Sequence, residues 1–255
     1  MKVIDVSQYN GVIKWDKVAK DCDGVILRVG YRGYSSGSLV LDKKFNYNFT
    51  QAKLKKIPIG VYFVTQAINE KEAREEARYT TNLLKGYKLD LPVFIDSENA
   101  NNGKGRADAG KLTKSKRTDI LKAFCAECEK IGYESGVYAS QSWFNDYTTL
   151  KELQKYFIWV ARYASVPPTI NYDAWQYTSV GKVSGILGNV DISKFKYKTK
   201  KKTTSKATTK KSNEAIAKEV IAGKWGNGEA RKKKLEKAGY NYKTIQALVN
   251  KLLKK

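Results

Sequence analysis

The chain has 255 residues, 48 of them Lys or Arg against 25 Asp or Glu, and it contains no histidine. The lack of histidine excludes a Ser-His-Asp triad, a Cys-His pair and a histidine-ligated metal. Acid–base chemistry near neutral pH must therefore come from carboxylates, lysines, tyrosines or cysteines whose pKa the fold has moved.

Short β-rich runs alternate with helical patterns along residues 1–196. The expected strands are Val3–Val6, Val25–Val29, Ile59–Val64, Val93–Asp96, Gly136–Ala139, Phe157–Ala161, Ala174–Tyr177 and Val190–Ile192. The expected helices are Lys43–Lys56, Glu70–Lys85 and Lys114–Ile131. The first five strands alternate with helices, which favours parallel pairing, whereas turn-rich segments separate the last three. The pattern predicts an α/β fold, an incomplete TIM-like barrel, with its chemistry at the C-terminal ends of the strands.

The composition changes after residue 196, and residues 197–212 are predicted to form an extended linker. From Lys198 to Ser212 the sequence contains only Lys, Thr, Ser and one Ala, so it lacks core-forming residues and repels itself. Residues 197–255 carry 18 basic and 4 acidic side chains. This charge either keeps the chain in solution or attracts a polyanion.

Residues 213–255 are expected to form a small helical module. Three asparagines, Asn213, Asn227 and Asn241, are expected to be helix N-caps, and helices are expected to stop at Gly223 and Gly239. Apolar residues recur at helical spacing in the first and last of these segments. The module is therefore predicted to be an all-α three-helix bundle with a marginal core.

Four acidic residues lie at or near predicted strand ends: Asp5, Asp96, Glu98 and Asp191. Residues i and i+2 of a strand face the same way, so Asp96 and Glu98 are expected to point together into the barrel mouth. Two neighbouring carboxylates raise the pKa of one of them, which supplies the general acid that glycoside cleavage requires. Taken alone, an Asp-x-Glu pair is more often solvated or caps a helix, and only the surrounding strands favour a catalytic site.

Aromatic and amide side chains also follow strand ends, at Tyr62, Tyr138, Trp159, Trp175 and Gln176. Aromatic faces among acids and amides suit a sugar-binding groove, although each ring could equally fill the core. The Cys125–Cys128 pair lies in a predicted helix without further ligands, which favours ordinary packing over a metal or redox site. We expect no cofactor and no metal.

Six stretches of residues 1–196 resemble, in the same order, the Chalaropsis-type lysozymes of glycoside hydrolase family 25. They are Asp5–Gly11, Phe94–Glu98, Val137–Ser140, Trp159–Tyr163, Trp175–Tyr177 and Val190–Ser193. The resemblance implies a (β/α)5β3 barrel that hydrolyses the β-1,4 bond between N-acetylmuramic acid and N-acetylglucosamine in peptidoglycan. It places the general acid at Glu98 and the other acids of the site at Asp96, Asp5 and Asp191. The residues expected to bind substrate are Tyr62, Tyr138, Trp175, Gln176 and Arg28.

The roles of the acids other than Glu98 stay open at this point. In one hypothesis the 2-acetamido oxygen of the sugar attacks and Asp96 assists it, which departs from the two-carboxylate scheme. In the other, a carboxylate attacks directly or activates water.

Residues 213–254 resemble a single Cpl-seven-type cell-wall-binding repeat, on the stretch Val220–Gly228 and on Arg231, Leu235 and Tyr240. The resemblance implies a module that binds the muropeptide part of peptidoglycan. The residues expected to contact the wall are Lys224, Trp225, Asn227 and Arg231. Trp225 is equally well explained as a core residue of a small bundle.

Peptidoglycan is therefore the expected partner, together with anionic wall polymers that the basic tail attracts. A non-catalytic wall-binding or nucleic-acid-binding protein is the alternative, and phosphate binding would weaken steeply with salt. Neither nucleic acid nor membrane is expected as a partner, and a monomer is slightly favoured. The N-terminal residues are not expected to form a signal peptide. A phage-endolysin-like enzyme is expected, made in the bacterial host cytoplasm and acting on the wall after release.

Overall fold

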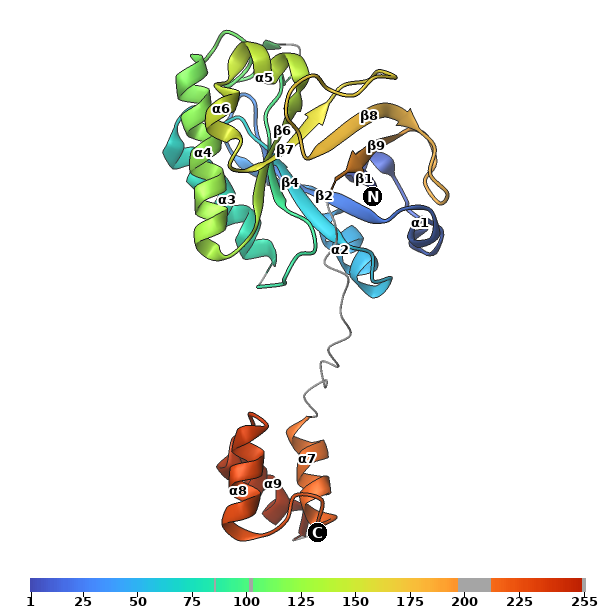
Figure 1. The fold of residues 1–255 in the computed structure, drawn as a ribbon, viewed down its shortest axis with the longest axis vertical. Coiled ribbons are helices and arrows are strands. Elements are labelled where there is room, and N and C mark those ends of the chain that lie inside the picture. The colour runs from blue at the N-terminus through green and yellow to red at the C-terminus, as the bar shows by residue number, and fades with distance from the viewer. Residues whose placement is uncertain (85, 101–102, 197–211, 254–255) are drawn as a thin grey trace. The chain divides into compact units, whose positions relative to one another are not determined.

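A computed structural model describes residues 1–84, 86–100, 103–196 and 212–253. The chain divides into two compact units, Met1–Thr199 and Lys200–Lys255 (Figure 1). The predicted linker, residues 197–212, lies outside the described residues except for Ser212, so its extended form stays a prediction.

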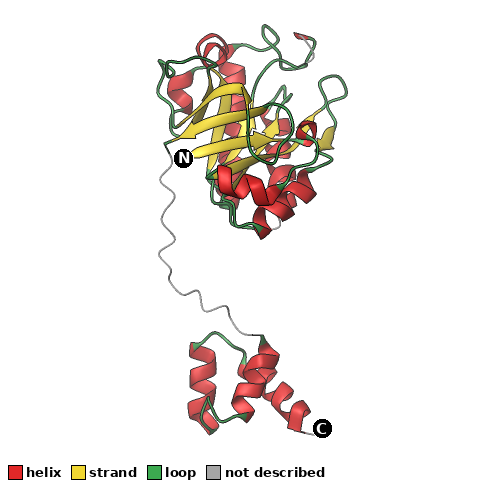
Figure 2. Cartoon of the chain, turned by 90° about the vertical axis from the view of Figure 1, so that its right-hand side faces the viewer, coloured by secondary structure: helices red, strands yellow, loops and turns green. Residues whose placement is uncertain are grey.

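The first unit alternates strands and helices and then ends in three strands. The elements are β1 (Lys2–Val6), a 3-10 turn (Gln8–Asn10), α1 (Trp15–Asp21), β2 (Gly24–Arg32), β3 (Leu39–Leu41), α2 (Phe45–Leu54), β4 (Ile59–Val64), α3 (Glu70–Leu84), β5 (Val93–Asp96), α4 (Lys114–Ile131), β6 (Ser135–Ser140), α5 (Gln141–Tyr147), α6 (Leu150–Leu153), β7 (Phe157–Ala161), β8 (Ala174–Gly181) and β9 (Val190–Phe195). The helices lie outside the strands (Figure 2).

The strands close into a barrel. β1 pairs in parallel with β2, and the parallel pairing continues through β4, β5, β6 and β7 to β8. β9 then pairs antiparallel with both β8 and β1, which closes the ring, and β3 adds to β2 outside it. Five strand–helix units followed by three strands confirm the predicted α/β barrel of (β/α)5β3 type.

Some elements were absent from the sequence prediction. α1, α5 and α6 are 7, 7 and 4 residues long, too short for a clear helical repeat of apolar residues. Strand β3 has only three residues, which pair back onto β2. Turn-rich segments do separate the last three strands, as expected.

Two layers of apolar side chains support the barrel. Inside it, Phe94, Trp159 and Phe195 pack edge to face, with ring centroids 5.0 to 6.2 Å apart. Between the strands and helices, Cys125 and Cys128 are buried in the main core without a disulfide. The cysteines therefore serve packing, as the sequence indicated, and burial raises the pKa of Cys125 to about 12.

The second unit contains α7 (Asn213–Ile221), α8 (Gly228–Lys237) and α9 (Tyr242–Leu253), which confirms the three predicted helices. Their core is formed by Ile216, Ala217, Val220, Leu235, Tyr240, Ile245 and Val249. Gly223 and Gly239 adopt φ of 76° and 79° after the first two helices, the left-handed conformation that glycine favours.

One predicted cap is wrong. The N-cap of α7 is Ser212 and not Asn213, because the Ser212 hydroxyl accepts a hydrogen bond from the Ala215 amide at 3.2 Å. Serine and asparagine cap helices about equally well, so composition alone did not separate these neighbours. Asn241 does cap α9, since its side chain accepts from the Thr244 amide at 3.0 Å.

No helix among residues 1–84, 86–100, 103–196 and 212–253 combines the length and the apolar character needed to cross a bilayer.

Gly136 on β6 offers a test of the barrel interior. A Cβ at this position would lie 2.5 Å from the Phe157 carbonyl oxygen and 2.6 Å from the Phe94 ring. We expect Gly136→Ala to lower the free energy of unfolding by about 1–3 kcal/mol through overpacking. Urea unfolding followed by tryptophan fluorescence measures the change. The control is Gly110→Asn, at an exposed left-handed position with no atom within 4 Å of the built Cβ, and an equal loss there would contradict the overpacking argument.

Candidate active site

Four carboxylates gather at the C-terminal end of the parallel strands. Asp5 lies on β1, Asp96 ends β5 and Glu98 follows two residues later. Asp191 lies near the start of β9, and because β9 is antiparallel its start reaches the same end of the barrel. Asp5 and Asp191 are direct cross-strand partners, which places their Cβ atoms about 5 Å apart. The closure of the barrel thus puts two like charges face to face.

Burial and like charge act together on the two inner acids. The side chains of Asp5 and Asp96 are only 8% and 4% exposed. Burial, reinforced by the charges of the neighbouring acids, raises the pKa of both well above the usual range. Arg28 opposes this effect at Asp96. The Asp96 Oδ1 atom is buried and has no hydrogen-bond partner among the described residues.

The two outer acids are more accessible. The Glu98 side chain is exposed at the barrel mouth, yet the protein atoms around its carboxyl group and the charge of Asp191 raise its pKa. Burial raises the pKa of Asp191 to about 6. An accessible carboxyl group whose pKa is raised keeps its proton to a higher pH and can donate it to a bound ligand.

A hydrogen-bonded chain orients Asp5. The Gln176 side-chain amide donates from Nε2 to Asp5 Oδ2 at 2.9 Å. Its Oε1 accepts from the hydroxyls of Tyr138 at 2.8 Å and Tyr163 at 2.9 Å. With two donors on the oxygen, the amide nitrogen must face the carboxylate. Tyr138 and Gln176, predicted to bind substrate, are 9% and 2% exposed and therefore position Asp5 from inside the barrel.

The segment that carries Glu98 is held from both sides. Before it, the Trp143 indole donates to Ser97 Oγ at 3.0 Å. After it, the fully buried Asp108 accepts from the amides of Ala100 at 2.7 Å and Gly105 at 2.8 Å. These contacts fix the backbone on either side of the candidate acid.

Arg28 and Tyr62 lie beside the acids as neighbours on β2 and β4. Asp42 accepts from Arg28 Nε at 2.7 Å and holds the guanidinium. Tyr62 is half-buried, and burial together with the charge of Asp5 raises the pKa of its hydroxyl well above the usual value. Tyr62 therefore remains a neutral hydrogen-bond donor near the carboxylates.

Trp175 lies away from the other predicted substrate-binding residues. It precedes Gln176 on β8, so its side chain points to the opposite face of the strand. Its indole donates to the Arg162 carbonyl oxygen at 2.7 Å, and Lys194 lies over the ring, 5.4 Å from the centroid. The structure does not bring Trp175 to the acids.

Tyr163 and Asp108 were not singled out as site residues from the sequence. Tyr163 follows the end of β7, so the rule that chemistry collects at C-terminal strand ends points to it. Asp108 lies ten residues beyond Glu98 within a loop, where nothing in the sequence indicates its contact with Ala100.

In the second unit, most residues predicted to contact the wall bind other parts of the module. Arg231 donates to the Gly226 carbonyl at 2.8 Å, to Asn227 Oδ1 at 2.8 Å and to Gln246 Oε1 at 3.3 Å. Trp225 is half-buried and donates to Glu219 at 3.1 Å. Lys224 is exposed.

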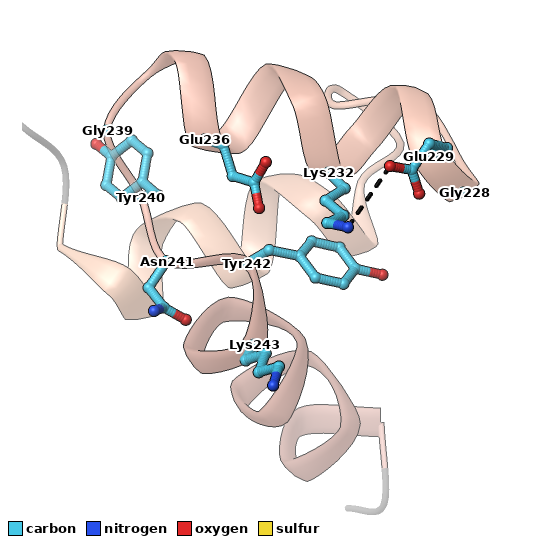
Figure 3. Close-up of a pocket in the computed structure, with 9 residues that line it drawn as sticks. All are labelled: Gly228, Glu229, Lys232, Glu236, Gly239, Tyr240, Asn241, Tyr242 and Lys243. Atoms are coloured by element: carbon cyan, nitrogen blue, oxygen red, sulfur yellow. Dashed lines mark ion pairs between the residues drawn. The ribbon is translucent and has the colours of Figure 1, made fainter.

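A groove of about 860 Å³ lies where α8 turns into α9 (Figure 3). It is lined by Gly228, Glu229, Lys232, Glu236, Gly239, Tyr240, Asn241, Tyr242 and Lys243. Figure 3 shows the Tyr242 ring extending beside Lys232, which pairs with Glu229 at 3.6 Å. Charges of both signs beside an aromatic ring suit a ligand that carries polar and ionic groups.

Asp191 lies opposite Asp5 where β9 closes the barrel, and its raised pKa predicts that the free energy of unfolding depends on pH. The folded pKa of Asp191 is about 6, above the value near 3.9 in an unfolded chain. Stability is therefore lost as the pH rises through this window. We expect the free energy of unfolding of Asp191→Asn to be about 1 kcal/mol larger than that of wild type at pH 7.5. This value allows for partial screening of the Asp191 charge by solvent. The gain should vanish below pH 4.

Thermal and urea unfolding at both pH values measure this difference. Asp146→Asn, an exposed aspartate on α5, serves as the control. Equal stabilities of wild type and Asp191→Asn at pH 7.5 would contradict the electrostatic cost assigned to this site.

Comparison with known proteins identifies both units. Residues 4–186 match glycosyl hydrolases family 25, and residues 214–253 match the CW_7 repeat. Lysozyme M1 of Streptomyces globisporus is 28% identical over 202 residues, which cover 75% of this chain and 66% of that protein. The lysozyme of Streptococcus phage Cp-7 is 28% identical over 209 residues, which cover 76% and 56%.

The modular autolysin LytC from Streptococcus pneumoniae superimposes with a TM-score of 0.65 at 34% identity, over 75% of this chain and 46% of LytC. The chain thus spans 66% or less of the length of these three relatives. The family match covers well over half of the chain, and the resemblance seen in the sequence is confirmed. The chain belongs to glycosyl hydrolases family 25 and carries one CW_7 repeat after the barrel.

Proposed function

We propose that the chain is an endolysin-like muramidase that cleaves the β-1,4 bond between N-acetylmuramic acid and N-acetylglucosamine in peptidoglycan. One observation carries the proposal: four acids meet at the barrel mouth, and the most accessible of them, Glu98, has a raised pKa. Family membership and relatives named lysozyme and autolysin support it. The non-catalytic alternative has no comparable support. Four neighbouring acids at the barrel mouth cost folding free energy, and a barrel that catalyses no reaction would gain nothing in return.

Glu98 takes the role of general acid. Its proton passes to the glycosidic oxygen as the bond from that oxygen to the sugar C1 breaks. The leaving sugar departs with a new hydroxyl group, and the positive charge that develops at C1 is stabilised by the neighbouring carboxylates.

Asp96 is proposed to assist attack by the sugar's own acetamido oxygen. Its buried, unpartnered Oδ1 can accept a hydrogen bond from the acetamido N–H, which increases the electron density on the attacking oxygen. Water then opens the cyclic intermediate at C1, and Glu98 takes up a proton from that water. The rival scheme, attack by a carboxylate itself, predicts a covalent glycosyl-enzyme that mass spectrometry would detect.

Glu98→Gln tests the acid. We expect at least a ~100-fold loss of kcat, because glutamine cannot donate a proton to the leaving oxygen. Mass spectrometry of peptidoglycan digests measures it, and wild type should yield fragments with reducing-end muramic acid. Glu70→Gln, on the exposed start of α3, is the matched control. Full activity of Glu98→Gln would contradict the assignment of Glu98 as general acid. Fragments from wild type with N-acetylglucosamine at the reducing end would show that the enzyme is a glucosaminidase.

We infer that the second unit attaches the enzyme to the wall. The CW_7 match supports this role. Residues 212–253 contain nine basic and four acidic side chains, which also favours contact with anionic wall polymers. Because Arg231 and Trp225 bind within the module, the groove of Figure 3 is the better contact surface.

The groove can be tested with Tyr242→Ala. We expect about fivefold weaker binding to purified peptidoglycan, since the variant loses the aromatic face while the α9 core residues Ile245 and Val249 remain. Sedimentation with insoluble wall material measures binding, and Tyr242→Phe, which keeps the aromatic ring, is the control. Unchanged binding by Tyr242→Ala would contradict the groove, and tighter, salt-sensitive binding to DNA would favour the nucleic-acid alternative.

A further inference from the structure

Tyr9 is an exposed aromatic ring on a rigid support. Its side chain is 79% exposed, and it follows Asp5 by four residues in the loop after β1. An exposed ring gains little from such a position in folding, since it buries almost no apolar surface.

The loop around Tyr9 is fixed by hydrogen bonds. Ser7 Oγ accepts from the Tyr9 amide at 3.3 Å, and Asn10 Oδ1 accepts from the Ser7 amide at 2.8 Å. Asp42 accepts from the Gln8 amide at 3.0 Å. The backbone that carries the ring is therefore already ordered, and a ligand that meets the ring does not have to order it.

The inner face of the ring rests on the candidate active site. The Arg28 guanidinium lies over the Tyr9 ring, 4.8 Å from its centroid. Asp42 holds Arg28 at 2.7 Å while also binding the Tyr9 loop, and Arg28 in turn acts on the charge of Asp96. One face of the ring is thus covered by a cation next to the acids, and the other is open to solvent.

We propose that the open face of Tyr9 is a stacking platform for a sugar ring of the glycan strand, next to the acids that cleave it. The inference rests on the proposed muramidase function and adds a substrate-binding residue to it. Tyr9 is a substrate contact and not an acid, base or nucleophile. The apolar face of a pyranose, with its axial C–H groups, matches the negative face of an aromatic ring.

The physical alternative is that Tyr9 only shields Arg28 from water. The two roles differ in what they change. A stacking platform supports substrate binding and leaves the titration of the acids alone. A shield controls how strongly Arg28 acts on Asp96, so its loss would shift the pH profile of kcat without weakening glycan binding.

The experiment compares Tyr9→Ala, Tyr9→Phe and Tyr47→Ala in the full chain. Tyr47 is a 49% exposed tyrosine on α2 and serves as the matched control. Calorimetric binding of a tetrasaccharide of alternating N-acetylglucosamine and N-acetylmuramic acid is measured in the Glu98→Gln background. The same three substitutions in active enzyme give KM, kcat and the pH profile. The second unit is the same in all variants, so differences report on the barrel.

We expect Tyr9→Ala to bind the tetrasaccharide about tenfold more weakly, with KM raised about tenfold at unchanged kcat and pH profile. Tyr9→Phe should stay within about twofold of its parent because it keeps the ring, and Tyr47→Ala should match its parent. Binding by Tyr9→Ala equal to its parent, with or without a shifted pH profile, overturns the inference. Tyr9-dependent binding without cleavage by wild type would refute the muramidase function and leave the inference standing. No glycan binding by the Glu98→Gln parent would overturn the inference, whereas cleavage of peptidoglycan by wild type decides the muramidase function.

Discussion

The desolvation of four neighbouring carboxyl groups at one end of the barrel is the constraint on which the rest of the barrel depends. Asp5 and Asp191 face each other across the strands that close the ring. Asp96 is buried, and one of its oxygens has no hydrogen-bond partner in the part of the chain that the structure describes. Each arrangement costs free energy relative to the solvated acids. The apolar layers inside and outside the barrel offset this cost, and the acids are confined to one end where those layers stop. A stable core therefore holds together groups that would separate in a looser structure.

The pKa values of the four acids depend on burial and on nearby charges more than on the net positive charge of the whole chain. A net charge of +23 should lower carboxylate pKa values. The pKa values of Asp5, Asp96, Glu98 and Asp191 are instead raised. Exposed charges more than about 10 Å apart are largely screened by physiological salt, whereas a partner about 4 Å away at an effective dielectric of 20 contributes about 4 kcal/mol. Burial and contact charges therefore outweigh the distant lysines.

The sequence predicted what depends on chain order and periodicity. The apolar runs marked the eight barrel strands, and the rule for strand ends singled out Asp5, Asp96, Glu98 and Asp191. The sequence did not settle which way a strand residue faces when both faces are buried. Trp175 and Gln176 are both buried, and only the pairing of β8 with β9 decides that the amide points inward. Long-range contacts such as that of Asp108 with the Glu98 segment, or the choice of Ser212 over Asn213 as a cap, depend on geometry that neither composition nor spacing encodes.

The hydrogen-bond network around Asp5 stabilises the buried position and the orientation of its carboxyl group. An unpaired buried carboxylate would be driven to protonate or to reach solvent. The Gln176 amide opposes part of that cost by donating to Asp5 Oδ2. The amide can do so only because Tyr138 and Tyr163 both donate to its oxygen, and burial raises the pKa of Tyr163 to about 12, which keeps that hydroxyl protonated. Two neutral phenols on β6 and after β7 thus fix the direction of an amide on β8, which fixes an acid on β1. The site is consequently a property of the closed ring, because opening any of these strand pairs would release Asp5 from its orientation.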